Sequence, residues 1–344
     1  MDPSSPIPLE VLLVIGFMVW VCAGFWVWVF LRKRNHQPVL PVAPRRQVPW
    51  KGPDLILFFV IYVGSMFAAH AILNFLPGKI YDPPPSDTTS EIASNETPPH
   101  HKHKPLTEEK TQSNGKKNEH PIVMLLRSKD PRMLFLCFFM AVIFAPINEE
   151  ITYRMFIQGY LEKLDWRFRR WSKHPHNPRL ESRSSFLSSL PWGMVPILAT
   201  SAFFAMLHFR KAAEPPPMDL LLRTTLTLMI GGTISLLLLF PWLGIVRKAR
   251  LVDFGIVPKE IPKDIFRGIL GFIAVTVPVY GIQFATAPLV PKEISQDPIS
   301  IFFLAIAFGV VWCRTHRLIP SIVMHMLFNG FSLTMAMYML RGGF

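Results

Sequence analysis

The sequence predicts an all-α polytopic membrane protein in which about eight transmembrane helices form one bundle. Half of its 344 residues are hydrophobic and only 17% are charged, against roughly a quarter in ordinary soluble domains. The mean hydropathy is +0.31. The apolar residues gather into runs of about 17 to 26, which are long enough for a helix to cross a hydrocarbon core of about 30 Å.

Eight apolar runs define the expected spans. Because unpaired backbone groups are costly in lipid, each run is expected to be a helix. The first run lacks a basic leader and a small-residue cleavage site, so we expect a retained anchor. The three cysteines lie inside runs at unrelated spacings, which indicates buried thiols rather than a disulfide framework or a metal cluster. The runs cover residues 9–31, 54–76, 132–161, 188–209, 221–246, 264–290, 299–314 and 318–340.

The basic residues follow the expected topology. The net charge is +13, and basic clusters come after the first, third, fifth and seventh runs. Because loops on the inner side of a membrane carry such clusters, we expect both termini outside, in a bacterial inner membrane. The same rule explains the charge without a nucleic-acid partner. The clusters are Arg32–Arg34, Arg167–Lys173, Arg247–Arg250, and Arg314 with Arg317.

The chain is expected to divide into three regions. Residues 1–77 hold two N-terminal transmembrane helices, and residues 132–344 form the catalytic bundle, with two additional spans at about 221–290. Residues 78–131 are rich in Pro, Ser, Thr, Asn, Lys and His, so they bury too little apolar surface to offset the entropy of ordering and should be largely disordered. Four histidines in this loop complete no recognisable metal-ligand spacing: His100, His101, His103 and His120.

A second basic stretch, residues 162–185, places aromatic side chains among its arginines. Trp166, Phe168 and Trp171 give the pattern of a segment that lies in the headgroup layer. An ordinary inside loop is the alternative interpretation.

Only two acidic residues lie well inside an apolar run, and they are adjacent: Glu149 and Glu150. Charges in a bilayer core are costly, so those present usually face the bundle interior and mark a site. On a helix, Arg154 can pair with Glu150 at i+4, which leaves Glu149 about 100° round the axis as a free base. Pro146, one turn earlier, removes a ladder hydrogen bond. A buried ion pair that only fixes helix packing is the alternative.

Two later runs add polar side chains that can meet this pair. Phe204 and His208 lie near the end of the fourth run. His325 and Asn329 lie in the last run at i and i+4, so they project from one helical face. Counted at 1.5 Å per residue, these groups can meet in the inner half of the membrane.

These residues resemble the three signature motifs of the CPBP family, EExxxR, FxxxH and HxxxN, in the same order and each in an apolar run. That family comprises the CAAX prenyl-protein endopeptidases and bacteriocin-processing or immunity proteins. The similarity covers roughly residues 132–210 and 299–340, with a looser likeness over 253–290. The motif residues are Glu149, Glu150, Arg154, Phe204, His208, His325 and Asn329.

The resemblance implies an intramembrane endopeptidase that lies among membrane lipids and cleaves a protein or peptide. Glu149 and His208 would activate a water for attack on a peptide carbonyl, without a metal or other cofactor. His325 and Asn329 would donate hydrogen bonds to the developing oxyanion. The supporting residues would be Glu150, Arg154 and Phe204.

Two other interpretations stay open. A zinc protease would use a glutamate and two histidines as ligands, although the sequence has no H-E-x-x-H motif and the histidines lie on separate runs. A non-catalytic membrane protein of the same fold, such as an immunity protein, a scaffold or a transporter, would use the glutamates for packing or proton transfer. The sequence shows no inverted repeat that would favour a transporter.

One departure from the family pattern lies between the second and third motifs, which residues 209–324 separate. This stretch contains two expected spans, so it returns the chain to the same side of the membrane. These two helices either insert beside the catalytic core or replace helices on its N-terminal side.

Overall fold

The computed structural model describes residues 9–40, 42–43, 46–75, 130–172, 190–209, 217–291 and 297–341, which are helical apart from short connections. Residues 78–129, with the expected disordered loop and its four histidines, lie outside these ranges. The helices described are α1 Leu9–Arg34, α2 Gly52–Phe75, α4 Pro131–Phe138, α5 Ala145–Glu150, α6 Gly159–Ser172, α8 Met194–Leu207, α9 Met218–Val246, α10 Ile261–Thr286, α11 Pro298–Thr315 and α12 Leu318–Arg341. A 3-10 turn, Pro258–Glu260, precedes α10.

The all-α polytopic membrane fold expected from the sequence is confirmed. Seven helices of the described part are long and apolar enough to cross a membrane, and the chain is an integral membrane protein. The expected fourth span, 188–209, is wrong in length, because α8 has only 14 residues. The apolar run includes Pro191, Trp192 and Phe209, which lie outside the helix. The helix begins after Gly193, whose φ of +80° is left-handed, and ends before His208.

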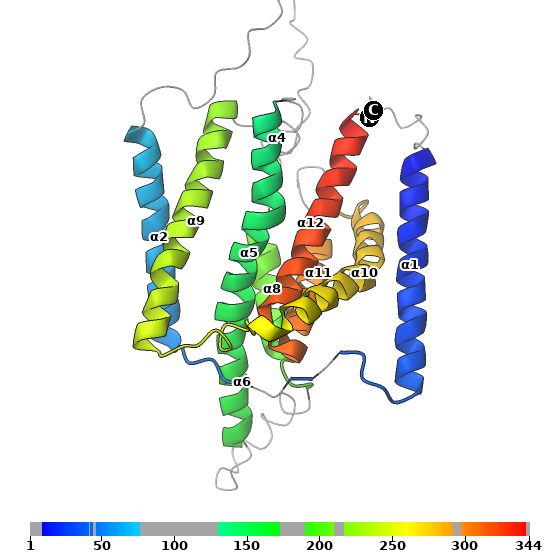
Figure 1. Cartoon of the computed structure of the whole chain (residues 1–344), viewed down its shortest axis with the longest axis horizontal. Coiled ribbons are helices and arrows are strands. Elements are labelled where there is room, and N and C mark those ends of the chain that lie inside the picture. Colours follow the sequence, from blue (N-terminus) through cyan, green and yellow to red (C-terminus); the bar gives the residue numbers. More distant parts are fainter. Residues whose placement is uncertain are drawn as a thin grey trace, which may run out of the picture.

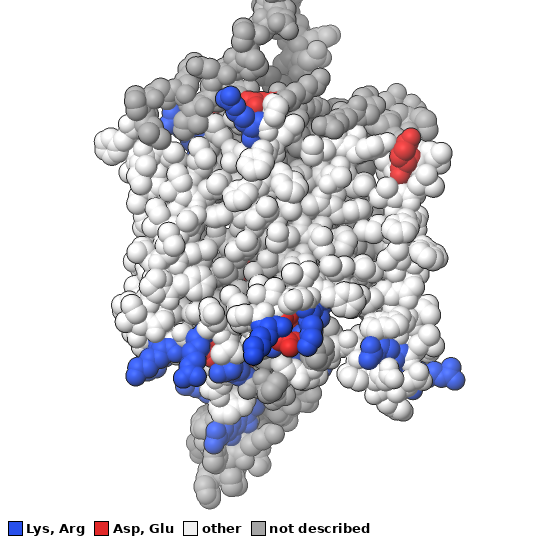
Figure 2. All heavy atoms as spheres, in the orientation of Figure 1, with Lys and Arg blue, Asp and Glu red and all other residues white. Residues whose placement is uncertain are grey.

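The helices run largely parallel, with α10 crossing the bundle obliquely (Figure 1). The start of α1 and the end of α12 lie at the same end of the bundle. On the face shown in Figure 2, most lysines and arginines gather at the opposite end, below a broad uncharged band. This distribution agrees with the alternation of basic loops in the sequence.

The helix that carries the glutamate pair is the longest in the described chain, and it is not α-helical throughout. α4, α5 and α6 are joined by two π-helical segments, Phe139–Phe144 (η1) and Ile151–Gln158 (η2). Together they form one continuous rod from Pro131 to Ser172. Because π-helical turns inside α-helices are frequent at functional sites, α5, which lies between the two π-helical segments and holds both glutamates, is a candidate site.

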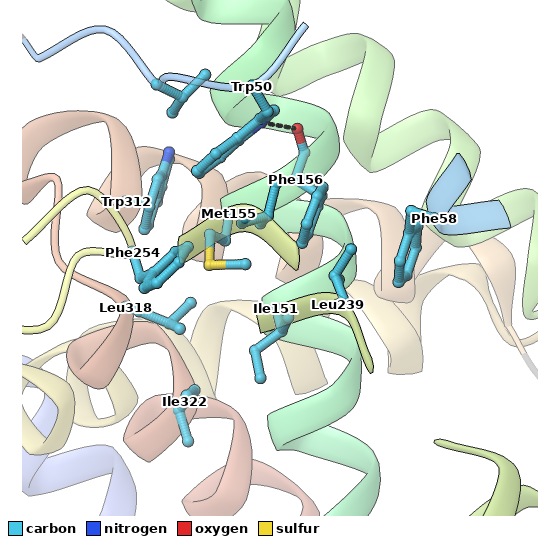
Figure 3. Close-up of a cluster of buried hydrophobic side chains, with 12 residues drawn as sticks. Trp50, Phe58, Ile151, Met155, Phe156, Leu239, Phe254, Trp312, Leu318 and Ile322 are labelled. Atoms are coloured by element: carbon cyan, nitrogen blue, oxygen red, sulfur yellow. Dashed lines mark hydrogen bonds between the residues drawn. The ribbon is translucent and has the colours of Figure 1, made fainter. Parts of the chain in front are cut away.

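Residues of the N-terminal region pack against this rod in a buried apolar cluster (Figure 3). Trp50 and Phe156 are fully buried, and the indole nitrogen of Trp50 donates to the Phe156 carbonyl at 3.3 Å. Lys163 Nζ donates to the carbonyls of Val48 and Trp50 at 2.8 and 2.7 Å. The segment before α2 therefore packs against the helix that carries the glutamates.

The two spans between the second and third motifs occupy different places. α9 packs along α2, and Gly231 of α9 lies against Ser65 and Met66 of α2. The next residue, Gly232, faces α5, where an added Cβ would lie 2.6 Å from the Asn148 amide nitrogen. α10 packs on α12, the helix with His325, and also contacts α1 and α11. Of these two helices, α9 thus flanks the glutamate helix, and α10 packs against the helix that carries the last motif.

Candidate active site

Glu150 and Arg154 form a fully buried ion pair. Their side chains are 0% exposed, and Arg154 Nε lies 3.3 Å from Glu150 Oε2. The guanidinium lies between the rings of Phe204 and Phe308, with both centroids 5.8 Å from its central carbon. Since a charge away from water needs a counter-ion, each member of this pair holds the other in place.

Glu149 points differently, as its position round the helix predicts. Its side chain is 27% exposed, and its two carboxylate oxygens face two histidines. Oε1 lies 3.8 Å from His208 Nε2, and Oε2 lies 3.7 Å from His325 Nε2. Both distances exceed hydrogen-bond range, but one water can bridge groups at this separation.

Both histidines are oriented by a second contact at Nδ1. His208 Nδ1 lies 2.8 Å from the carbonyl oxygen of Phe204, and His325 Nδ1 lies 3.1 Å from Glu150 Oε1. A carbonyl and a carboxylate only accept hydrogen bonds, so each Nδ1 carries a proton and each Nε2 faces Glu149.

Aromatic rings fix the planes of these histidines. Phe204 stacks on His208 with centroids 4.2 Å apart, and Phe308 stacks on His325 at 4.7 Å. Tyr153 meets Phe204 edge to face at 4.9 Å. The same two phenylalanines that enclose Arg154 therefore also position the histidines.

Asn329 contacts the backbone of η1, the π-helical segment before α5. Its amide nitrogen donates to the Ala141 carbonyl at 2.8 Å. The ladder here runs from each N–H to the carbonyl five residues before, as Ala145 N–H to Met140 shows. In that pattern the donor for Ala141 would be residue 146, and Pro146 has no N–H. The side chain of Asn329 thus supplies the hydrogen bond that Pro146 leaves open, and its second N–H is not needed for this role.

The structure brings together six of the seven motif residues named from the sequence: Glu149 and Glu150 from α5, Arg154 from η2, Phe204 and His208 from α8 and its end, and His325 from α12. The seventh, Asn329, lies one turn further along α12 and contacts Ala141 of η1. Sequence reasoning missed the role of Phe308 on α11. Phe308 lies outside the three motifs, and the sequence signal for it was its place in the region 299–340 that resembles the family. Among the described residues, no group of three or more His, Cys, Asp or Glu side chains is placed to hold a metal ion.

Comparison with known families gives one match. A family model described as "Type II CAAX prenyl endopeptidase Rce1-like" matches residues 131–250 and 255–331, which is more than half of the chain and includes every motif residue. No curated protein and no solved structure matches. The matched residues cover the Pro131–Ser172 rod, α8, α9, α10, α11 and most of α12. The chain therefore belongs to the Rce1-like family of type II CAAX prenyl endopeptidases, a family of membrane proteases.

Proposed function

We propose that this protein is an intramembrane endopeptidase that hydrolyses peptide bonds with a water activated by Glu149 and His208. The observation that carries the proposal is the placement of the Glu149 carboxylate between two histidine Nε2 atoms, at 3.8 and 3.7 Å. The Glu149 carboxylate is partly exposed and can be reached from outside the bundle, whereas Glu150 is fully enclosed.

In the proposed reaction, a water lies between Glu149 and His208 and loses a proton to this pair as its oxygen attacks the peptide carbonyl. The attack forms the new C–O bond and moves the carbonyl electrons onto oxygen. The proton then goes to the leaving amine as the C–N bond breaks. General bases of this kind contribute roughly 10²- to 10⁴-fold to a rate.

The oxyanion needs donors, and the tautomer of His325 decides when that residue can act. Its Nδ1 proton is directed at Glu150, so Nε2 donates to an oxyanion only when the ring carries both protons. The free N–H of the Asn329 amide is the second donor in this proposal.

A comparison of wild type with Glu149→Gln tests the proposal. Each full-length protein, purified in detergent, is incubated with a solubilised membrane proteome, and new peptide termini are identified by mass spectrometry. The matched control is Glu260→Gln, because Glu260 is exposed to a similar extent, 28%, but lies at the far basic end beside Lys263.

Wild type and the Glu260 variant should give the same new termini, and the Glu149 variant should give none. The same cleavage products from the Glu149 variant would contradict the mechanism. An absence of products from all three proteins would favour the non-catalytic alternative.

A further inference from the structure

Two adjoining cavities lie at the basic end of the bundle, away from the candidate active site. Arg46, Gln47 and Glu162 line both of them. The larger has a volume of about 100 Å³ and is also lined by Trp166 and Trp192, and the smaller, of about 20 Å³, extends to Trp312. Glu162 comes 13 residues after Glu149 on the same rod, which is about 20 Å along a helix axis.

Glu162 is a buried carboxylate without a strong cationic partner. It is 5% exposed, accepts from Gln158 Nε2 at 2.9 Å, and lies 3.9 Å from His316 Nδ1. No lysine or arginine pairs with it within the described residues. The ammonium of the neighbouring Lys163 donates hydrogen bonds to two backbone carbonyls, those of Val48 and Trp50. Because a buried carboxylate is costly without a counter-ion, this position favours a ligand that brings a cation with N–H donors.

Trp312 and Arg46, which line the smaller cavity together with Glu162, have the opposite requirement. Trp312 is 2% exposed and lines the smaller cavity, yet its indole nitrogen has no hydrogen-bond partner in the described chain. Figure 3 shows that nitrogen directed away from Phe254 and Leu318. Arg46 pairs with Asp253 through Nε at 3.0 Å, but half of its side chain is exposed. These two donors favour an anionic or strongly accepting group.

A ligand of one charge sign satisfies only one of these requirements. A phosphoethanolamine group carries a primary ammonium two carbons from a phosphate, so its ammonium suits Glu162 while its phosphate suits Arg46 in the larger cavity. The smaller cavity has room for about one water, which would join the Trp312 N–H to the phosphate. A trimethylated ammonium has no N–H to donate to Glu162. Trp166 and Trp192 belong to the aromatic residues at the basic end, where the headgroups of the inner leaflet are expected.

We propose that the cavities lined by Arg46, Glu162 and Trp312 bind a phosphoethanolamine group, supplied by the headgroup of a membrane phospholipid. The site is separate from the peptidase chemistry and does not depend on it. Occupation would supply the countercharge of Glu162 and would link the segment before α2, α6 and α11 through one ligand.

The test measures lipid retention on the full-length protein. Wild-type protein is reconstituted in nanodiscs with equal amounts of phosphatidylethanolamine and phosphatidylcholine, transferred to mild detergent, and analysed by native mass spectrometry. Arg46→Gln and Glu162→Gln remove one charge each from the cavities. Arg250→Gln is the matched control, because Arg250 is an exposed arginine in the connection between α9 and α10 at the same end. A second arm adds soluble glycerophosphoethanolamine as a competitor.

Wild type and the Arg250 variant should retain one phosphatidylethanolamine, preferred about tenfold over phosphatidylcholine. The preference should fall toward equal retention in both the Arg46 and the Glu162 variants. The soluble compound should displace the lipid, and binding of the soluble compound without retained lipid would support the site with a soluble source. Equal retention of both lipids without competition would overturn the proposal, as would a preference that survives both substitutions.

Discussion

Replacement of Glu150 by glutamine tests whether the second glutamate is structural. The substitution preserves shape and leaves an amide oxygen that still accepts from His325, but it removes the one charge that pairs with Arg154 among the residues that the structure describes. The guanidinium is completely buried, and none of its nitrogens has another hydrogen-bond partner among the described residues. Breaking one side of a buried pair costs about 3 to 5 kcal/mol, and we expect a loss in this range.

A loss of this size should lower the melting temperature by roughly 10 °C, since about 1 kcal/mol corresponds to a few degrees in a chain of this size. Thermal unfolding in detergent, followed by tryptophan fluorescence, measures it. Glu149→Gln is the control, because Glu149 is 27% exposed and pairs with no arginine in the described part of the chain, so its melting temperature should stay near that of wild type.

The double variant Glu150→Gln with Arg154→Met separates charge from packing. It removes both charges and keeps an apolar side chain between Phe204 and Phe308, so most of the lost stability should return, although cleavage should not. An unchanged melting temperature in Glu150→Gln would refute the structural role assigned to Glu150. A double variant less stable than the single one would refute the explanation by an uncompensated buried charge.

Three further predictions concern the site and its orientation. Asn329→Ala should cost about 1 to 3 kcal/mol of stability by leaving the Ala141 carbonyl unpaired, and adding Pro146→Ala, which restores an N–H, should recover melting temperature but not cleavage rate. Cleavage should survive strong zinc chelation, and loss with recovery on added Zn²⁺ would favour a zinc protease instead. Tags at Asp2 and Phe344 should both be accessible to protease from outside intact cells, and protection of either tag would reverse the expected orientation.

Much of the fold follows from hydropathy alone, because long apolar runs in lipid have few alternatives to the helix. The length of α8 does not follow from hydropathy, because Trp192 and Phe209 are apolar but lie outside the helix, which begins only after the left-handed Gly193. The packing of the residues before α2 on the Pro131–Ser172 rod was also not predictable from the sequence. That contact depends on Lys163, whose ammonium serves two carbonyls rather than a headgroup.

The site was predictable where helical spacing decides the geometry. The i+4 relation of Glu150 and Arg154 and the different direction of Glu149 follow from 3.6 residues per turn. The π-helical segments on either side of α5 were not predictable from helical spacing, which assumes 3.6 residues per turn throughout. For the same reason, the partner of Asn329 in η1 could be found only from the structure.

The central claim is that Glu149 and His208 act together on one water. Initial cleavage rates of wild type, Glu149→Gln, His208→Ala and the double variant, on a peptide identified in the proteome experiment, test it most directly. If the two residues are one functional unit, each single substitution should lower the rate by roughly 10²- to 10⁴-fold, and the double variant should be little slower than either. A Glu149 variant that keeps the wild-type rate, or single effects that multiply in the double variant, would contradict the account.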